Sequence, residues 1–502
     1  MSKFIRNKRK LKSFILLVII ITTLSSNMAF SSTDATDETQ NSDYLKSIMD
    51  MVNDKHKGSV DQNKMMENAL KGIFSSMDQY TEFYTKEEAN QFFSTIDGEY
   101  VGIGIAFNQL DGQYIVEEVY KDSPAEKAGI ATGDKIISVD GQSISKKGSQ
   151  DVVKMISGKK GTDVIMGIIK DGEKNQTKIK VTRDDIRVNP VSYEIRGDIG
   201  YIKLSIFNMN AAAEMAKALK ELESKKIKKI ALDLRDDPGG EVSQVVEIAK
   251  NFVPEGLIAK LDFNSEKMQD IEYRSDLKDK KFKLAVLVNG NSASASEILT
   301  GAIQDTAAGT IIGTKTFGKA KVQSIYSILT PEAYKKYEDQ LGVKLVIGDD
   351  LEDKYKITPE DSEIIGWVKI TTGYYYTPNG RMIDLKGITP DINVSDGKDA
   401  INGVNLSSIN KLKVKIKPKL NSQSYEVYSA KNILRVCGYN VDAGNDKFDA
   451  KTFDALKKFQ KKSGLYPCGN LDFSTQKALN KSLDSVVINT DKQYLKAVEV
   501  LN

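Results

Sequence analysis

The sequence predicts a multidomain α/β protein. Over residues 187–398, apolar runs of strand length alternate with segments whose apolar residues recur at helical spacing, which is typical of layered α/β structures. Residues 98–186 instead contain short strand-like runs separated by turn residues. The chain has 502 residues. A domain usually has about 100 to 200, so we expect several domains.

The N-terminus has the layout of a secretory signal. A basic stretch is followed by an apolar run over residues 14–21 and by small residues up to Ser31. The unbroken run has 8 residues, whereas a spanning helix needs about 20; residues 22–24 and 28–30 could extend it. Two alternatives stay open, a signal peptide cleaved near Ser31 and an uncleaved membrane anchor. Both predict an extracytoplasmic protein.

Charge and histidine content exclude two classes of function. Residues 1–31 hold six basic residues and no acid, so their removal changes the formal net charge from +3 to −3. Nothing then indicates a nucleic-acid partner, which would need a basic patch on the folded domain. His56 is the single histidine and there are two cysteines. A multi-histidine zinc site is therefore excluded, and we expect no metal and no other cofactor.

The C-terminal region contains a repeat. Asp449 and Asp472 each begin the pattern D-x-x-T-x-x-A-L, which predicts two helices with an aspartate N-cap and a buried Ala-Leu pair. Cys437 and Cys468 lie in the same small module. In an exported chain they could form a stabilising disulfide; the alternative is two buried free thiols.

The segment "GNSASASEI", residues 290–298, follows the apolar run "KLAVLV" and opens a predicted helix. A serine nucleophile needs a base, and His56 lies in a polar segment far upstream, so a Ser-His-Asp triad is not expected. Lys319 differs from most lysines because its neighbours are apolar or small. Burial there would have to lower its pKa by about 3 units for it to serve as a base. The strand "TIIGTKTFG" delivers it, which completes a β-α-β unit with the serine segment.

These residues alone leave Ser292, Ser294 and Ser296 open as the nucleophile. Ser294 precedes Glu297 by three residues, which matches a capping box. It either merely caps the helix or is a nucleophile at a helix N-terminus, where amides and the helix dipole stabilise an oxyanion.

"SASASEI" followed by "TFGKAKVQ" resembles the C-terminal processing peptidases, also called tail-specific proteases. In that family, a serine within S-A-S-A-S-E precedes by 25 residues a lysine within T-F-G-K-G-x-V-Q, and Ser294 and Lys319 have the same spacing. The resemblance implies a dyad in which Ser294 is the nucleophile, Lys319 the base and Gln323 a residue that orients the lysine. Ala320 replaces a glycine common in the family, and we expect it to be tolerated.

The resemblance extends to "LDLRDDPGGEV", which is similar to the family segment DLRxNPGG. It implies an oxyanion hole formed by the amide of Ala295 with that of Gly239 or Gly240; without the dyad, the segment would be interpreted as an ordinary Pro-Gly-Gly turn. Residues 374–394 fit the closing segment of the family. The stretch "ALKGIFSSMDQYTEFYTKEE" resembles its N-terminal helical part.

Residues 98–186 resemble a PDZ domain, in which a loop of backbone amides binds the C-terminal carboxylate of a peptide that adds as a strand. Ser157 stands where many members have arginine, so coupling between peptide binding and activity is expected to be weaker or built differently. The implied peptide-binding loop consists of Val101, Gly102, Ile103, Gly104 and Ile105.

Residues 424–482 resemble the peptidoglycan-binding module of cell-wall enzymes. The predicted boundaries follow these resemblances: 1–31 signal peptide or anchor, 32–42 linker, 43–97 helical region, 98–186 PDZ domain, 187–398 Ser/Lys protease domain with a charged insertion at 324–366, 399–423 linker, 424–482 small all-α peptidoglycan-binding domain and 483–502 tail.

The sequence thus predicts an exported serine endopeptidase at the cell envelope, whose partners are protein substrates bound by their C-terminal tails and peptidoglycan. Membrane anchoring and a homodimer both stay open. One alternative is a non-catalytic adaptor that uses only the PDZ and wall-binding modules. A penicillin-binding enzyme would need S-D-N and K-T-G motifs beside S-x-x-K, and no such set is present.

Overall fold

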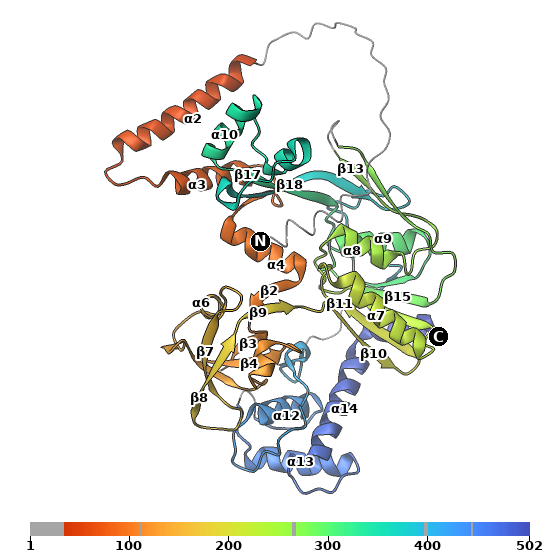
Figure 1. Cartoon of the computed structure of the whole chain (residues 1–502). Helices are drawn as coiled ribbons and strands as arrows, with labels where there is room; N and C mark the ends of the chain where they lie inside the picture. The colour runs from red at the N-terminus through yellow and green to blue at the C-terminus, as the bar shows by residue number, and fades with distance from the viewer. Residues whose placement is uncertain (1–34, 111, 264–267, 396–399, 443–444) are drawn as a thin grey trace. The chain divides into compact units, whose positions relative to one another are not determined.

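The computed structural model describes residues 35–110, 112–263, 268–395, 400–442 and 445–502 (Figure 1). The predicted leader lies outside these residues. The chain divides into two compact units, 1–66 and 67–502. In the first, helix α2 (Ala35–Lys55) begins inside the predicted 32–42 linker, which is therefore wrong over residues 35–42. Across the described ranges, no helix combines the length and the apolar character that a membrane crossing requires.

The predicted N-terminal helical region contains α3 (Gln62–Ser75) and α4 (Lys86–Asp97), but also a strand, β1 (Glu82–Thr85). Thr85 and Glu88 form a capping box that starts α4. Strand β1 pairs with β18 (Ile364–Tyr376) of the protease region, with Phe83 opposite Val368. Phe83 is almost fully buried, so β1 is part of the protease fold.

The PDZ region forms an antiparallel sheet in the order β3-β4-β5-β7-β8, with β6 paired to β5. Its apolar core is closed by the short helices α5 (Pro124–Lys127) and α6 (Ser149–Ile156), which confirms a β domain with two helices. Strands β2 (Glu99–Gly102) and β9 (Asp184–Arg187) pair separately. The sheet strands are β3 (Ile105–Leu110), β4 (Gln113–Val119), β5 (Lys135–Val139), β6 (Gln142–Ser143), β7 (Asp163–Ile169) and β8 (Gln176–Thr182).

The protease region is built on a sheet of order β10-β11-β12-β15-β16-β19, parallel except for the β10–β11 pair. Helices α7 (Ala211–Ser224), α8 (Val242–Ala249) and α9 (Ala295–Asp305) contribute to the large core with one face of this sheet. The strands are β10 (Val191–Arg196), β11 (Ile199–Leu204), β12 (Lys229–Asp233), β15 (Lys283–Val288), β16 (Thr310–Gly313) and β19 (Ile392–Asn393).

Strands β12, β15 and β16 place the predicted catalytic segments at one edge. The Pro-Gly-Gly loop follows β12, the serine segment follows β15 and the lysine segment follows β16. Because these neighbouring strands are parallel, their carboxyl ends meet at the same edge, where α/β proteins bind ligands. This confirms the predicted β-α-β unit, although β16 ends at Gly313, earlier than predicted.

A second sheet has the order β1-β18-β13-β14, with β17 (Lys321–Leu329) also paired to β18. Strands β13 (Gly256–Phe263) and β14 (Ile271–Ser275) complete it. The predicted insertion at 324–366 is too long, because its ends belong to β17 and β18. Between them lie α10 (Pro331–Leu341), α11 (Gly348–Asp350), η1 (Leu351–Tyr355) and η2 (Asp361–Glu363). Helix α10 and η1 contribute Ala333, Tyr337 and Leu351 to a small core.

The C-terminal module consists of α12 (Tyr425–Val436), α13 (Ala450–Lys462) and α14 (Phe473–Thr490). Asp449 and Asp472 cap α13 and α14 by accepting from the amides of Thr452 (2.7 Å) and Thr475 (2.8 Å), which confirms the prediction from the repeat. A hairpin, β20 (Ala400–Ile401) and β21 (Val404–Asn405), and the turn η3 (Leu406–Ser408) occupy part of the predicted linker.

Both cysteines are free thiols, so the disulfide alternative is wrong for this structure. Cys437 packs against the module core at the end of α12. The sulfur of Cys468 instead contacts the side-chain amide of Gln460 at 3.4 Å and the carboxylate of Asp472 at 3.9 Å.

The predicted tail is also wrong, because its residues form the end of α14 and a further helix, α15 (Lys492–Leu501). Tyr494, Ala497 and Leu501 of α15 are buried against the protease sheet, on a cluster that includes Ala285 and Leu287 of β15. Leu284, Val286 and Val288 of the same strand belong to the large core. Since side chains alternate along a strand, α15 covers the opposite face of the sheet.

Candidate active site

The three serines that the sequence left open occupy different environments. Ser292 is fully buried; its hydroxyl donates to the carbonyl of Leu234 at 2.7 Å. Ser296 is also fully buried, and its hydroxyl donates to the carbonyl of Asp237 at 2.9 Å. Ser294 is partly exposed. Of the three, Ser294 alone combines access to solvent with a position at the start of α9.

Ser294 has an unusual backbone conformation, with φ of 55°. A non-glycine residue in this region is strained and needs support from its surroundings. Its amide donates to Oε2 of Glu297 at 3.0 Å, and its carbonyl accepts from the hydroxyl of the buried Tyr375 at 3.2 Å. Gly239 packs so closely that a Cβ there would lie 2.8 Å from Cβ of Ser294.

The Glu297 carboxylate joins the serine segment to the lysine segment. Its Oε2 accepts from the amides of both Ser294 (3.0 Å) and Lys319 (2.9 Å). Its Oε1 accepts from the Thr316 hydroxyl (2.5 Å) and the Gly318 amide (2.7 Å). Burial raises the pKa of Glu297, while these hydrogen bonds act in the opposite direction. One buried side chain thus brings the backbones of the two predicted dyad residues together.

Lys319 lies in a loop that begins earlier than expected, because β16 ends at Gly313 and the predicted strand continues to Gly318. The Leu385 amide donates to the Gly318 carbonyl at 2.8 Å, and the Ala320 amide donates to Asp384 at 3.0 Å. These bonds to residues 384–385 replace the pairing that a longer β16 would make. Ala320 is buried and is not among the residues with positive φ, so its methyl group fits without strain.

The Lys319 ammonium lies 4.6 Å from the centre of the Tyr80 ring. Burial lowers the pKa of Lys319, and the positive charge of Lys369 lowers it further, whereas Asp78, Glu82 and Glu297 raise it. The net direction is downward, as a lysine that acts as a base requires.

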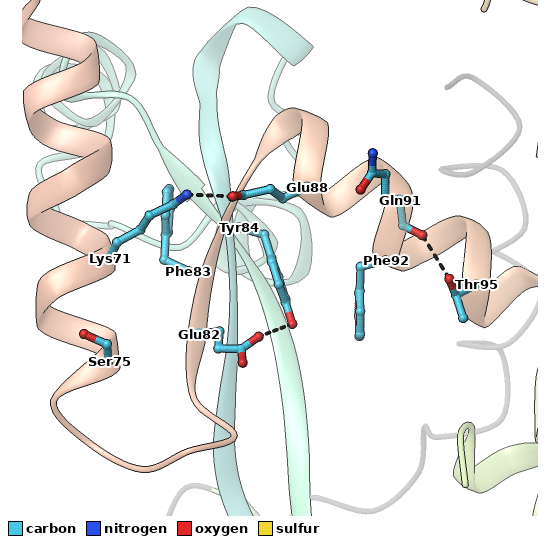
Figure 2. Close-up of a pocket in the computed structure, with 9 residues that line it drawn as sticks. All are labelled: Lys71, Ser75, Glu82, Phe83, Tyr84, Glu88, Gln91, Phe92 and Thr95. Carbon is cyan, nitrogen blue, oxygen red and sulfur yellow. Dashed lines mark hydrogen bonds and ion pairs between the residues drawn. The ribbon is translucent and has the colours of Figure 1, made fainter. Parts of the chain in front are cut away.

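A cavity of about 540 Å³ lies beside this region, and Glu82 is one of the residues that line it (Figure 2). Lys369 does not line the cavity but contacts Tyr84, which does. Glu82 accepts a hydrogen bond from Tyr84, and Lys369 donates to the Tyr84 hydroxyl at 2.7 Å. Figure 2 shows this carboxylate and phenol beside the ring of Phe92, with the Lys71–Glu88 ion pair at the other side. The lining includes neither Ser294 nor Lys319, although the charge of Glu82 acts on the pKa of Lys319. The lining residues are Lys71, Ser75, Glu82, Phe83, Tyr84, Glu88, Gln91, Phe92 and Thr95.

Gln323 lies on β17 opposite Thr371. Its Nε2 is buried and has no hydrogen-bond partner among the described residues. The expected hydrogen bond between Gln323 and Lys319 is not formed in this structure. The structure places Gln323 four residues along the chain from the lysine, at the start of the strand that leaves the site.

The three predicted oxyanion-hole residues have different roles in the geometry. The Gly239 amide is already engaged, because it donates to Oδ1 of Asp237 at 2.8 Å. Gly240 has φ of 144°, and a Cβ there would lie 2.4 Å from the Phe207 carbonyl oxygen, so only glycine fits. The Ala295 amide lies in the first turn of α9, beside Gly239. This leaves the amides of Gly240 and Ala295 as the candidates for oxyanion stabilisation.

The predicted peptide-binding loop is only partly a loop. Val101 and Gly102 belong to β2, paired with Asp185 and Asp184, and Ile105 begins β3. Ile103 and Gly104 lie between the strands, and Gly104 has φ of 79°. Strand β3 is at the end of its sheet order, which is the geometry that strand addition by a peptide needs.

Sequence reasoning missed two residues of this site and the full role of a third. Glu297 was noticed only as a helix cap. Tyr375 lies in the predicted closing segment and carried no separate signal. Asp237 could have been found from the sequence, because it stands where the family segment DLRxNPGG has asparagine.

Comparisons with known proteins identify three domains in the chain. Peptidase family S41 matches residues 198–394, a PDZ domain matches 115–170 and a peptidoglycan binding domain matches 423–479. A CtpA-like serine protease of Staphylococcus epidermidis is 30% identical over 493 residues, which cover 97% of this chain and 91% of that protein. Carboxy-terminal processing protease CtpB of Bacillus subtilis is 31% identical over 88% of this chain and 85% of that protein.

A solved structure, the photosystem II D1 C-terminal processing protease, is 24% identical with a TM-score of 0.38, covering 72% of this chain and 89% of that chain. The relatives from Staphylococcus epidermidis and Bacillus subtilis show the family, because each is at least 30% identical over most of both chains. The chain therefore belongs to the C-terminal processing proteases of peptidase family S41, and it is a serine-type peptidase that carries a PDZ domain and a peptidoglycan-binding domain.

Proposed function

We propose that this peptidase is an exported endopeptidase that cleaves with a Ser294–Lys319 dyad, recognises substrates by their C-terminal tails and is retained at the cell wall. The observation that carries the dyad is the shared hydrogen-bond acceptor, Oε2 of Glu297. It holds the amides of Ser294 and Lys319 no more than about 6 Å apart. The non-catalytic adaptor is disfavoured because this buried arrangement would serve no purpose in it.

In the proposed reaction, neutral Lys319 accepts the proton of the Ser294 hydroxyl as its oxygen attacks the peptide carbonyl. The carbonyl oxygen becomes negative and is stabilised by the amides of Ala295 and Gly240 and by the N-terminus of α9. Lys319 then gives the proton to the leaving amine. Water then attacks the acyl-enzyme. Lys319 accepts a proton from this water and returns it to the Ser294 oxygen as the acyl group leaves.

The experiment that tests the dyad is covalent labelling. We expect a serine-directed phosphonate probe to attach to Ser294 alone, because Ser292 and Ser296 are fully buried. Peptide mapping by mass spectrometry locates the adduct, and the label should be lost in Lys319→Gln, which removes the base. Attachment to Ser292 or Ser296, or undiminished labelling without Lys319, would contradict the proposal.

For the PDZ domain, we expect the wild-type chain to bind a peptide with a free C-terminal carboxylate at least tenfold more tightly than the same peptide with an amidated end. Fluorescence titration measures both. A Gly104→Val variant is a poor test, because a Cβ there would lie 2.3 Å from Cβ of Ser123 and would disturb the fold itself. Equal affinity for both peptides would remove the support for tail recognition.

Retention at the wall is best tested in the full chain. A truncation near Asn402 would remove α15 from the protease sheet as well as the module, so its result would be ambiguous. Tyr466, between α13 and α14, is 85% exposed, and its ring is available for stacking on a sugar. We expect Tyr466→Ser to weaken binding to isolated peptidoglycan several-fold in pull-down assays.

The matched control is Tyr44→Ser, which removes an exposed tyrosine from α2. If both variants bind like the wild type, Tyr466 has no part in wall binding. If the wild type itself does not bind peptidoglycan, the proposed retention fails.

A further inference from the structure

Asp237 has a buried carboxyl group and contacts the segment that carries Ser294. It lies in the loop between β12 and α8 and is 0% exposed. Its Oδ1 accepts from the Gly239 amide at 2.8 Å, and its backbone carbonyl accepts from the Ala293 amide (3.0 Å) and the Ser296 hydroxyl (2.9 Å). Asp237 therefore holds the glycine loop on one side and the serine segment on the other.

The second oxygen of this carboxyl, Oδ2, is buried and has no hydrogen-bond partner within the described ranges. An ionised carboxylate in this position would be costly, because buried charges need partners on both oxygens. An uncharged carboxyl, with its proton on Oδ2, avoids that cost. The geometry thus favours the neutral form.

The position of the carboxyl also matters for the reaction. Gly239, which Asp237 holds, packs so closely that a Cβ there would lie 2.8 Å from both Cβ of Ser294 and the Ala295 amide nitrogen. The oxygen that becomes negative during acyl transfer forms beside these atoms. A negative charge on Asp237 would repel it, and such repulsion is strong in a buried site.

Burial raises the pKa of Asp237 to about 7, while the hydrogen bond from the Gly239 amide acts in the opposite direction. The group is therefore neutral below this value and ionised above it. The nearby charged side chains face other partners. Arg235 pairs with Asp233 and Asp491, and Asp236 accepts from Asn289 and Asn291. Glu297 accepts from the lysine segment, and the pKa of the partly buried Glu241 is raised by burial and by the charge of Asp97.

We propose that Asp237 is a positioning residue of the oxyanion loop, which is the segment 234–240 that follows β12, and that its carboxyl must be uncharged for the loop to stabilise the oxyanion. The inference rests on the Ser294–Lys319 chemistry proposed above. Ionisation of Asp237 then limits the activity of the enzyme toward alkaline pH, independently of Lys319. Lys319 requires deprotonation and makes activity rise with pH, whereas ionisation of Asp237 makes it fall.

The test compares Asp237→Asn with the wild type on one peptide substrate between about pH 5.5 and 8.5. Asparagine has the shape of aspartic acid but carries no charge at any pH. We expect the ratio of kcat/KM, variant over wild type, to be near one at pH 5.5 and to reach at least tenfold at pH 8.5. The ratio cancels the contribution of Lys319, which both proteins share.

Asp236→Asn is the matched control, because it removes an exposed carboxylate from the preceding residue. Its pKa is lowered, mainly through hydrogen bonds from Asn291 and Asn289 that outweigh the opposing effect of burial, so its ratio to the wild type should not change with pH. A constant ratio for Asp237→Asn, or a ratio that falls as pH rises, overturns the inference.

Two further measurements keep the outcome decisive. If Asp237→Asn does not fold, the wild-type profile alone must still bend near pH 7, where the rise of activity with pH becomes flat or turns into a fall. An undiminished rise through pH 7 overturns the inference. In a Ser294→Ala background, Asp237→Asn should raise Tm progressively from about pH 5 to pH 8, because a raised folded pKa costs stability as pH rises. Residual hydrolysis by Ser294→Ala itself would instead mean that the proposed function has failed.

Discussion

Ser294→Ala is expected to lower kcat/KM for an unstructured protein substrate by about 10⁴-fold or more, because the nucleophile acts as a unit with its base. The folded structure should be retained, since the Ser294 side chain is partly exposed and its backbone bonds to Glu297 and Tyr375 do not use the hydroxyl. Activity is measured by release of a fluorescent fragment, and folding by circular dichroism.

Ser292→Ala is the matched control. It removes a buried hydroxyl that donates to Leu234, which should cost about 1 to 3 kcal/mol of stability. The folded fraction should still cleave substrate. If Ser292→Ala were inactive and Ser294→Ala active, the assignment of the nucleophile would be wrong.

The base, Lys319, is tested in the same way. Lys319→Ala should be as inactive as Ser294→Ala, and the double variant no worse than either, because removing one member already disables the unit. Lys321→Ala is the control, since that ammonium also lies near the Tyr80 ring, at 5.5 Å, but pairs with Asp78. Additive losses in the double variant would indicate that the two residues act independently.

Local signals in the sequence predicted local structure well. The repeated D-x-x-T pattern located two helix starts, because an aspartate N-cap needs only the amides of the next turn. The strand–serine–helix–strand order placed the dyad segments at one sheet edge, because parallel strands joined by a helix leave little choice of topology.

Features that depend on contacts between distant residues could not be predicted in this way. The role of Glu297 arises from bonds that it accepts from one hydroxyl and two amides 19 to 22 residues later, and β1 joins a strand almost 300 residues away. In both cases the local sequence also fits a simpler structure, a capped helix for Glu297 and a helical region for β1. Only the packed fold distinguishes them.

The last helix is the clearest such case. Residues 483–502 looked like a tail because a short amphipathic segment at a chain end carries no sign of what it packs on. In the structure, Asp491 caps α15 through the amide of Tyr494 and pairs with Arg235 through two bonds of 2.7 and 2.9 Å. Arg235 lies in the oxyanion loop, two residues before Asp237. The end of the chain thus supports the active site.

Deletion of residues 491–502 is therefore expected to unfold the protease domain or leave it inactive and prone to aggregate. It exposes the sheet face beneath Tyr494 and Leu501, each worth about 1.5 to 3 kcal/mol of burial, and leaves the mostly buried Arg235 without one of its two partners, at a cost of about 3 to 5 kcal/mol. These losses approach the whole stability of a typical domain, about 5 to 15 kcal/mol.

A pair of point variants in the full chain isolates the packing contribution of α15. Leu501 is 0% exposed and Leu495, on the same helix, is 37% exposed. Leu501→Ala should lower the free energy of unfolding of the protease domain by about 2 to 4 kcal/mol in urea titrations, whereas Leu495→Ala should change it by under about 1 kcal/mol. The two substitutions remove the same atoms from the same kind of backbone, so helix propensity cancels. Equal effects, or a fully active deletion variant, would show that α15 does not support the protease sheet, because only a helix packed on that face makes the buried leucine the costlier one to lose.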